Sequence, residues 1–276
     1  MTRNLIEVNK DLCIRCGLCV NVCRGTLAMS EDGPEEIADF CIACGHCVAV
    51  CPKGALDHRL APLEKQALIK TSSLPDADTA AHFLRSRRSV RTFQKKRIPR
   101  ETVRKLLDIA RFAPTACNSQ GLTYHVVDDP GILKKIAAVI ADWAEEDLKN
   151  GALGKSPWSR NTANTIRGFR ENGEDTILRD APCLIIALAD KNMAVLGRDN
   201  THFSFTYAQL FAPSLNLGSC WSGLFEYCAA TQYEPLLKLL NLPENKCITG
   251  ALIVGYPVYH FSRLADRESL QITWQS

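Results

Sequence analysis

The sequence has no long apolar run. Its longest, such as residues 182–189, are far shorter than the ~20 residues that a membrane-spanning helix needs. No apolar core follows the first residues, so they do not resemble a secretory signal. No basic tract of the kind that binds nucleic acid is present either. We therefore expect a cytoplasmic protein that binds neither membranes nor nucleic acids.

The chain of 276 residues is 46% hydrophobic and 23% charged, which is ordinary for a globular protein of one large or two smaller domains. Its net charge of +3 is unevenly spread. Residues 1–60 contain eight acidic and six basic residues, whereas the remainder contains twenty-two acidic and twenty-seven basic residues. The second part therefore suits an anionic ligand such as a phosphate.

Cysteine is abundant, with thirteen residues. In a chain without a secretory signal, this number argues against a disulfide scaffold and for metal or redox chemistry. Eight of the thirteen lie between residues 13 and 51. The other five are scattered through the rest of the chain: Cys117, Cys183, Cys220, Cys228 and Cys247.

The eight clustered cysteines form two runs with the spacing C-x2-C-x2-C-x3-C, separated by a constant offset of 28 residues. Gly17 and Gly45 match at the same offset. This internal duplication resembles the bacterial ferredoxin with two [4Fe–4S] clusters, in which three cysteines of one run share a cluster with the fourth of the other. The resemblance implies that the first cluster is bound by Cys13, Cys16, Cys19 and Cys51, and the second by Cys41, Cys44, Cys47 and Cys23.

The spacing has a physical reason. Three thiolates on a tight loop can bind three irons of a cube, and the fourth must come from elsewhere in the chain. Because so small a domain buries little core, cluster binding should supply much of its folding energy. Zinc, which C-x2-C pairs also bind, is the alternative, but two complete four-cysteine runs exceed what tetrahedral zinc sites require. We expect His46 to be a surface residue and not a ligand.

The two runs differ in the residue after their last cysteine. Pro52 follows Cys51, as is usual, but Arg24 follows Cys23. A positive charge near that thiolate favours the reduced, more negative cluster. We therefore expect the cluster bound by Cys23 to have an altered reduction potential.

Beyond the ferredoxin module at residues 1–60, residues 61–78 have the composition of a linker, and residues 79–276 form a second domain. Helical spacing of apolar residues predicts a helix between Pro99 and Pro114 and another around residues 207–215. Buried strands are predicted at residues 183–189 and 251–254, with a weaker one at 124–127. The fold class is therefore α+β. Residues 142–178 fit either a mobile cover over a site or a pair of surface helices.

Four elements of the second domain occur in order at residues 87–93, 113–120, 217–223 and 255–257. Together they resemble the FMN-dependent nitroreductase family. The resemblance covers residues 80 to 276, and implies an α+β flavin domain and an intertwined homodimer with FMN at the subunit interface. Gly121-Leu122 departs from the Pro-Trp that many members have there, which affects one wall of the pocket.

The resemblance also implies ligands for FMN. Arg87 and Ser89, accompanied by Arg88 at what looks like the entrance of a helix, would bind the phosphate, since arginine suits phosphate oxygens. Arg91 would reach the pyrimidine side of the ring, where positive charge raises the flavin potential. Either Arg263 or Arg267 would complete the phosphate site.

Other residues would contact the flavin ring. Asn118, with Gln120 nearby, has an amide that can pair with the edge of the ring, although capping of a loop is the simpler role. Residues 219–223 would present backbone amides to the flavin, because their glycines permit close approach. This stretch contains Cys220, Trp221, Ser222 and Gly223, and we expect Cys220 to be a buried neighbour of FMN and not a nucleophile.

The combined interpretation is an oxidoreductase in which the two clusters pass electrons to FMN and on to a small acceptor such as a nitroaromatic or a quinone. No G-x-G-x-x-G turn is present, and an attached ferredoxin would be redundant if NAD(P)H were the sole donor. We therefore favour reduced ferredoxin or a similar protein as the donor, with NAD(P)H as a second option. The alternatives are an electron-transfer or redox-sensing partner protein, and a specialised dehalogenase or enoate-type reductase on the same fold. No catalytic residue is predicted.

Overall fold

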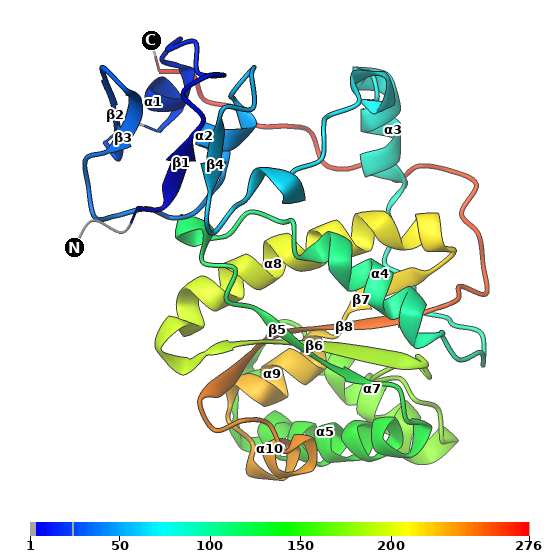
Figure 1. The fold of residues 1–276 in the computed structure, drawn as a ribbon. Coiled ribbons are helices and arrows are strands. Elements are labelled where there is room, and N and C mark those ends of the chain that lie inside the picture. Colours follow the sequence, from blue (N-terminus) through cyan, green and yellow to red (C-terminus); the bar gives the residue numbers. More distant parts are fainter. Residues whose placement is uncertain (1–3, 24, 276) are drawn as a thin grey trace. The chain divides into compact units, whose positions relative to one another are not determined.

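The computed structural model describes residues 4–23 and 25–275, so Arg24 lies outside the described residues. The chain divides into two compact units (Figure 1). The first runs to Leu74 and includes the short segment Cys117–Ser119, whereas the second comprises Pro75–Ala116 and the chain from Gln120 onward. The division between Leu74 and Pro75 falls inside the segment expected to be a linker. Each unit is described by itself below.

The first unit contains two small antiparallel sheets and two short helices. One sheet pairs β1 (Ile6–Val8) with β4 (Leu56–His58), and the other pairs β2 (Leu27–Ser30) with β3 (Gly33–Glu36). The helices are α1 (Leu18–Val22) and α2 (His46–Ala49). Two 3-10 turns, η1 (Leu63–Lys65) and η2 (Thr71–Ser73), follow the last strand. Because β1 precedes the first cysteine and β4 follows the last one of the two runs, their pairing brings the two ends of the cysteine-containing segment together.

The backbone repeats the duplication found in the sequence. Arg15 and Ala43 have φ angles of 51° and 52°, and Gly17 and Gly45 have φ angles of 77° and 72°. Each glycine is the N-cap residue of α1 or α2. A left-handed residue is least costly as glycine, which explains why a glycine recurs at this offset. Both cysteine loops therefore turn into their helices in the same way.

The second unit is built on a four-stranded antiparallel sheet in the order β5-β6-β8-β7. The two central strands are β6 (Cys183–Asp190), which is buried except at its last residue, and β8 (Lys246–Gly255), which is buried from Thr249 onward. The edge strands are β5 (Thr123–Val127) and β7 (Gly218–Trp221). Ile185 faces one layer of helices and Ile186 the other, because side chains alternate along a strand.

Helices cover both faces of this sheet, with α4 and α8 on one side and α5, α9 and α10 on the other (Figure 1). The first layer is α4 (Arg100–Ala110) and α8 (Ala194–Phe211), followed by η5 (Ala212–Leu215). The second is α5 (Pro130–Asn150), α9 (Gly223–Ala230) and α10 (Glu234–Leu240). The remaining elements are α3 (Ala77–Ser86), η3 (Ala116–Asn118), α6 (Ala152–Lys155), α7 (Ser159–Asn172) and η4 (Lys191–Met193). Within the described ranges, no helix is long and apolar enough to span a membrane.

The predicted α+β class is confirmed, and the helix expected behind Pro99 and the strands expected around residues 124, 183 and 251 are present as α4, β5, β6 and β8. The edge strand β7 was not predicted from the sequence, where this segment was expected only to present backbone amides to the flavin. Gly218 begins it, and a Cβ there would lie 2.5 Å from Val90. Close packing of the neighbouring segment therefore requires a glycine at this position.

Candidate cofactor sites

Four cysteines of the first unit line one cavity. They are Cys13, Cys16 and Cys19 of the first run and Cys51 of the second. This is the set that the ferredoxin resemblance implied for the first cluster. The pKa of the Cys19 thiol is raised chiefly by burial, with smaller contributions from Cys16 and Cys51. The fold therefore brings the last cysteine of one run to the first three of the other.

The complementary four cysteines are also close together. The pKa of Cys47 is raised to about 11, chiefly by burial, with smaller contributions from Cys23, Cys44 and Cys41 as nearby like charges. Thiolates packed this closely repel one another unless a cation is bound between them. The four side chains match the set implied for the second cluster. Soft thiolates in two groups of four suit iron–sulfur clusters, so the donor set fits this cofactor.

A basic recess of about 330 Å³ lies in the second unit. It is lined by four arginines with Ser89, Phe261 and Ala265, and no acidic residue is among these lining residues; the arginines are Arg87, Arg88, Arg91 and Arg267. The guanidinium of Arg88 lies 4.6 Å from the centroid of the Phe261 ring. Uncompensated guanidiniums around a hydroxyl form a site for a phosphate.

Arg87 lies at the end of a helix and not at its entrance, so the expectation of a helix beginning there was wrong. It is the C-cap residue of α3, and its Nη1 donates to Oε1 of Gln209 at 3.4 Å. The chain then becomes extended, because Ser89 bridges Ser219 of β7 and Val90 N donates to Ser219 O at 2.9 Å. Strand-like pairing therefore overrides helix continuation, and a cation at this end of α3 also suits the helix dipole.

The recess distinguishes the two C-terminal arginines between which the sequence could not choose. Arg267 lines it, whereas Arg263 is not among the lining residues. The tail reaches the recess because Val258 N donates to Thr92 O at 3.1 Å, which holds the chain beyond β8 against the segment that follows Arg91.

A second pocket of about 260 Å³ shares Arg91 with the recess. Residues 220–224 form one wall, and α6, α7 and the turn after α7 contribute residues such as Trp158 and Thr162. Within the described chain, the Ser222 hydroxyl is buried, with the residue 4% exposed, and has no hydrogen-bond partner. A buried hydroxyl left unpaired costs about 1–3 kcal/mol. Ser222 thus combines an unpaired hydroxyl with a position on the wall of this pocket.

Cys220 and Trp221 lie in the same stretch. Cys220 is buried, as expected, and its Sγ donates to Trp221 O at 3.4 Å. The Trp221 ring packs against His202 and Phe205 of α8, with centroid distances of 5.1 and 5.4 Å. Gly223 begins α9 and has open space where a Cβ would lie. These contacts fix the wall that carries Ser222.

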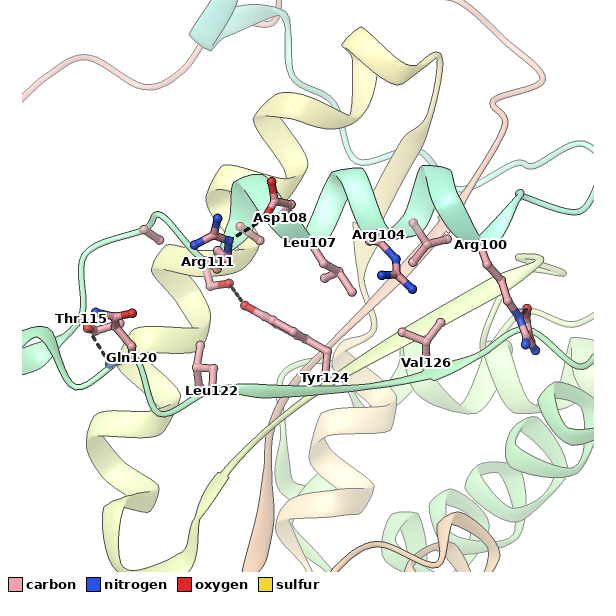
Figure 2. Close-up of a pocket in the computed structure, with 15 residues that line it drawn as sticks. Arg100, Arg104, Leu107, Asp108, Arg111, Thr115, Gln120, Leu122, Tyr124 and Val126 are labelled. Atoms are coloured by element: carbon pink, nitrogen blue, oxygen red, sulfur yellow. Dashed lines mark hydrogen bonds and ion pairs between the residues drawn. The ribbon is translucent and has the colours of Figure 1, made fainter. Parts of the chain in front are cut away.

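Gln120 lines neither the basic recess nor the pocket that contains Ser222. It lines a groove of about 770 Å³ between α4 and β5, which Figure 2 shows with Leu122, Tyr124 and Val126 along the strand. Gln120 N donates to Thr115 Oγ1 at 3.1 Å. Groove arginines have acidic partners, since Arg100 Nε donates to Asp128 Oδ2 at 2.9 Å. The basic recess differs because acidic residues are not among its lining.

Asn118 is placed in the first unit. Its Nδ2 donates to the carbonyl oxygens of Ile42 and Ala43 at 2.9 and 3.0 Å. Both carbonyls belong to the loop between Cys41 and Cys44. The amide therefore supports a cysteine loop in this chain, which resembles the loop-capping role considered from the sequence.

Residues 142–178 are of two kinds. Trp143 of α5 is 4% exposed and belongs to the core, so this part is neither a cover nor a surface helix. Beyond it, Leu153, Trp158, Thr162 and Thr176 face the pocket that contains Ser222. The segment thus forms a pocket wall from residue 153 onward.

Glu226 was not identified from the sequence. Its Oε1 accepts a hydrogen bond from Ala251 N at 2.7 Å, and burial raises its pKa to about 7. Ser222 N donates to Ala251 O at 3.0 Å, so both residues hold the same β8 residue. In the sequence, Glu226 is distinguished only as the single acidic residue of the apolar segment that forms α9 (Gly223–Ala230).

The comparisons with known proteins agree with this architecture. The model of the nitroreductase family matches residues 84–256, and the model of a 4Fe-4S dicluster domain matches residues 5–52. The nitroreductase match thus defines the class of the second unit as an FMN-dependent oxidoreductase, with which the sheet and its two helical layers agree. The chain belongs to the nitroreductase family, and an N-terminal 4Fe-4S domain is fused to it. The expected fusion of a ferredoxin-type domain with a nitroreductase domain, and the assignment as an FMN-dependent oxidoreductase, are confirmed at the level of the family.

Individual relatives are distant. A putative NADH dehydrogenase/NAD(P)H nitroreductase of Methanothermobacter thermautotrophicus is 24% identical over 177 residues, which is 63% of this chain and 75% of that protein. Iodotyrosine deiodinase 1 of Mus musculus is 26% identical over 179 residues, which is 63% of this chain and 61% of that protein. A nitroreductase of Bacteroides fragilis, solved with bound FMN, has a TM-score of 0.53 at 20% identity and covers 71% of this chain and 98% of its own. The last similarity shows the fold.

Proposed function

We propose that this protein is an FMN-dependent reductase of a small acceptor, to which two [4Fe–4S] clusters supply electrons. The observation that carries the proposal is the presence, in one chain, of two groups of four cysteines and of a recess with four arginines that shares Arg91 with a pocket. The first arrangement suits a one-electron carrier, and the second suits a phosphate-bearing cofactor.

The chain's own residues divide the binding of FMN between them. Arg87, Arg88, Ser89 and Arg267 would hold the phosphate in the basic recess. Arg91 lines both cavities, so it is suited to contact the cofactor where the recess meets the pocket. Ser222 would complete its hydrogen bonding on the ring. Bound FMN would supply the conversion between one-electron and two-electron transfer.

A homodimer is proposed because one chain does not assemble every expected FMN ligand. Gln120 lies just before β5, whereas Ser219 and Ser222 lie in and beside β7. These are opposite edges of the four-stranded sheet, and three strand spacings separate them by about 14 Å. A second copy of the chain, presenting its own Gln120, would complete the site.

The pocket beside Ser222 is the proposed acceptor site. Its volume of about 260 Å³ suits a small molecule such as a nitroaromatic or a quinone. Trp158, Asn161 and Thr165 line it together with residues 220–224 and offer one aromatic ring and two polar groups. The donor is proposed to be reduced ferredoxin or a similar protein, with NAD(P)H as the alternative.

The proposal is tested by analysing the purified protein for iron, acid-labile sulfide and FMN, and then measuring anaerobic turnover of a nitroaromatic and a quinone. We expect eight irons, eight sulfides and one FMN per chain, at about four irons per cluster, with turnover driven by reduced ferredoxin. Protein that contains zinc and no sulfide, or that retains no flavin, would contradict the proposal. Full cofactor content without turnover of any acceptor would favour an electron-transfer or redox-sensing protein.

Reductive dehalogenation is a second candidate. It is favoured by the similarity to iodotyrosine deiodinase 1, at 26% identity over 179 residues. Anaerobic incubation of the reduced protein with a halogenated phenol, followed by measurement of released halide, distinguishes it from nitroreduction. Release of halide at a rate above that of nitroaromatic reduction would replace the first proposal with this one.

A further inference from the structure

One buried imidazole lies against a cysteine of the second run. His58 ends β4 and is 2% exposed. Its Nε2 is 3.5 Å from Sγ of Cys41, which is within the range of a hydrogen bond to sulfur. Neither the cysteine spacing nor the ferredoxin resemblance assigned a role to this residue.

The other ring nitrogen shows which atom carries the proton. Nδ1 of His58 accepts hydrogen bonds from Leu60 N at 3.1 Å and Ala61 N at 3.2 Å. An imidazole nitrogen that accepts must have a free lone pair, so the single ring proton of the neutral side chain lies on Nε2. The sulfur of Cys41 is therefore the acceptor and His58 is the donor.

The turn around His58 fixes the ring in this orientation. Asp57 Oδ1 accepts from Leu63 N at 2.8 Å, and Gln66 Nε2 donates to Ala61 O at 2.9 Å. The same turn packs on the second cysteine loop, since a Cβ added to Gly45 would lie 3.1 Å from Gln66 Nε2. The donor is thus held in place by a closed network in the first unit.

The two halves of the duplication differ at this position. The offset of 28 residues pairs His58 with Ser30, whose hydroxyl instead donates to Gly33 O at 2.9 Å. Each set of four cysteines has one backbone N–H···S contact: Ala43 N donates to Cys41 of the second set, and Ala55 N donates to Cys51 of the first set, both at 3.3 Å. Among the described residues, the second set has in addition the imidazole contact from His58, whereas the matching Ser30 makes no such contact in the first set.

We infer that His58 donates an N–H···S hydrogen bond to Cys41 and thereby raises the reduction potential of the cluster that Cys41 would bind. Hydrogen bonds to cluster sulfurs stabilise the more negative reduced state and set the potential. The inference rests on the proposed function in one respect, namely the assignment of Cys41 as a ligand of the second cluster. His58 is a positioning and tuning residue and not a ligand.

Two substitutions separate the role of Nδ1 as an acceptor from the role of Nε2 as a donor. In His58→Asn, the amide oxygen replaces the acceptor Nδ1 and keeps the turn, but the donor to sulfur is lost. In His58→Gln, the longer side chain returns an N–H to the position of Nε2 but loses the acceptor for Leu60 and Ala61. His46→Gln is the matched control, because His46 is an exposed histidine next to Cys47.

The test is a spectroelectrochemical titration of the full-length protein followed by electron paramagnetic resonance, with iron and sulfide analysis of each sample. We expect one of two midpoint potentials to fall in His58→Asn while the other is unchanged, and both to stay at wild-type values in His58→Gln and His46→Gln. Midpoints that superimpose on wild type in His58→Asn, or that both shift together, would overturn the inference.

A measurement on the wild type decides the case even if the variants fail to bind clusters. In protein labelled with ¹⁵N only in histidine, pulsed electron paramagnetic resonance of the reduced clusters should detect a nitrogen coupled to one cluster. The coupling should persist in His46→Gln. Two intact reduced clusters without any coupled histidine nitrogen would overturn the inference, whereas protein without clusters would instead contradict the proposed function.

Discussion

The two units of this chain have hydrophobic cores of different size and composition. The core cluster of the first unit contains Leu27, Cys47, Val48 and Leu56, and the partly buried residues packed against it include Cys19, Cys23 and Cys51. The second unit has two larger apolar clusters on either side of its sheet, in which β6 is buried except at its last residue and β8 is buried from Thr249 onward. Cysteines of the two runs thus make up a large share of the small first core, whereas leucine, isoleucine and alanine dominate the two cores of the second unit, whose cysteines lie outside the runs.

This difference implies different sources of stability. Apolar burial contributes roughly 25 cal/mol per Å², which suffices for a sheet covered on both faces but is marginal for a domain of this small size. A core whose members are metal ligands gains its remaining stability from the bound cluster. The first unit should therefore depend on iron, and the second should not.

The largest expected effect is that of removing iron. Chelation of the cluster iron, or replacement of Cys47 by alanine, should abolish protection from hydrogen exchange over residues 4–74. The reason is that the cysteines of the first core then no longer bind a common cluster. Protection in β6 and β8 should persist. Hydrogen exchange followed by mass spectrometry measures both regions in one sample.

Cys228→Ala serves as the control, because Cys228 is buried in the second unit and lies outside both cysteine runs. It should leave the exchange of residues 4–74 unchanged. Equal protection of the first unit with and without iron would refute the proposed division of stability.

A smaller effect concerns the stability of the second unit as a function of pH. Burial raises the pKa of Glu226 to about 7 from 4.5, so the folded state favours the protonated acid. The free energy of unfolding should fall as pH rises from about 4.5 to about 7, by at most about 3 kcal/mol. Glu226→Gln keeps the oxygen that accepts from Ala251 N and should remove this slope, as measured by denaturant unfolding at several pH values.

Glu234→Gln is the matched control, because Glu234 is exposed and paired with Lys238 at 2.7 Å. It should retain the decline in stability between pH 5 and pH 7. A slope that survives unchanged in Glu226→Gln would show that another group carries it.

The next effect sharpens the distinction between the two C-terminal arginines. Arg267→Ala removes one guanidinium from the basic recess, and a hydrogen bond to a charged group contributes about 1.5–3 kcal/mol. FMN should therefore bind about ten- to hundredfold more weakly, as measured by fluorescence titration of the flavin-free protein. Arg263→Ala should change the affinity by less than about twofold. Equal losses from the two variants would contradict the assignment of Arg267.

The smallest effect is expected at Ser222. In flavin-free protein, Ser222→Ala removes a buried hydroxyl without a partner, so stability should be unchanged or rise by up to about 1 kcal/mol. In FMN-loaded protein the same change should be destabilising by about 1 kcal/mol, because a bonded group is lost. Thermal unfolding of both forms gives the comparison, and equal shifts in the two forms would argue against a ligand contact.

Local patterns in the sequence predicted much of this structure. The offset of 28 residues predicted the repeated loops, and the structure brings together the two sets of four cysteines that the ferredoxin resemblance implied. Helical spacing of apolar residues predicted α4, and short continuous apolar runs predicted β6 and β8. These features depend on residues that are near in sequence or on a repeated spacing, which one sequence contains.

Features that depend on pairing across the chain were not predictable in the same way. Arg87 ends a helix because Ser89 pairs with Ser219, and Arg267 reaches the recess through the path of the tail. His58 meets Cys41 because β4 pairs with β1 beside the second loop. Gln120 lies across the sheet from Ser222 because the strand order places β5 and β7 at opposite edges. No local spacing encodes these contacts.

The central claim is that electrons enter through the clusters and leave through the flavin. The most direct measurement is anaerobic stopped-flow mixing of the protein with reduced ferredoxin, NADH or NADPH, with cluster and flavin absorbance followed at separate wavelengths. We predict that ferredoxin reduces the clusters first and the flavin afterwards, and that Cys47→Ala abolishes this reduction while dithionite still reduces its flavin. Immediate reduction of the flavin by NADH or NADPH, with no response to ferredoxin, would contradict the claim.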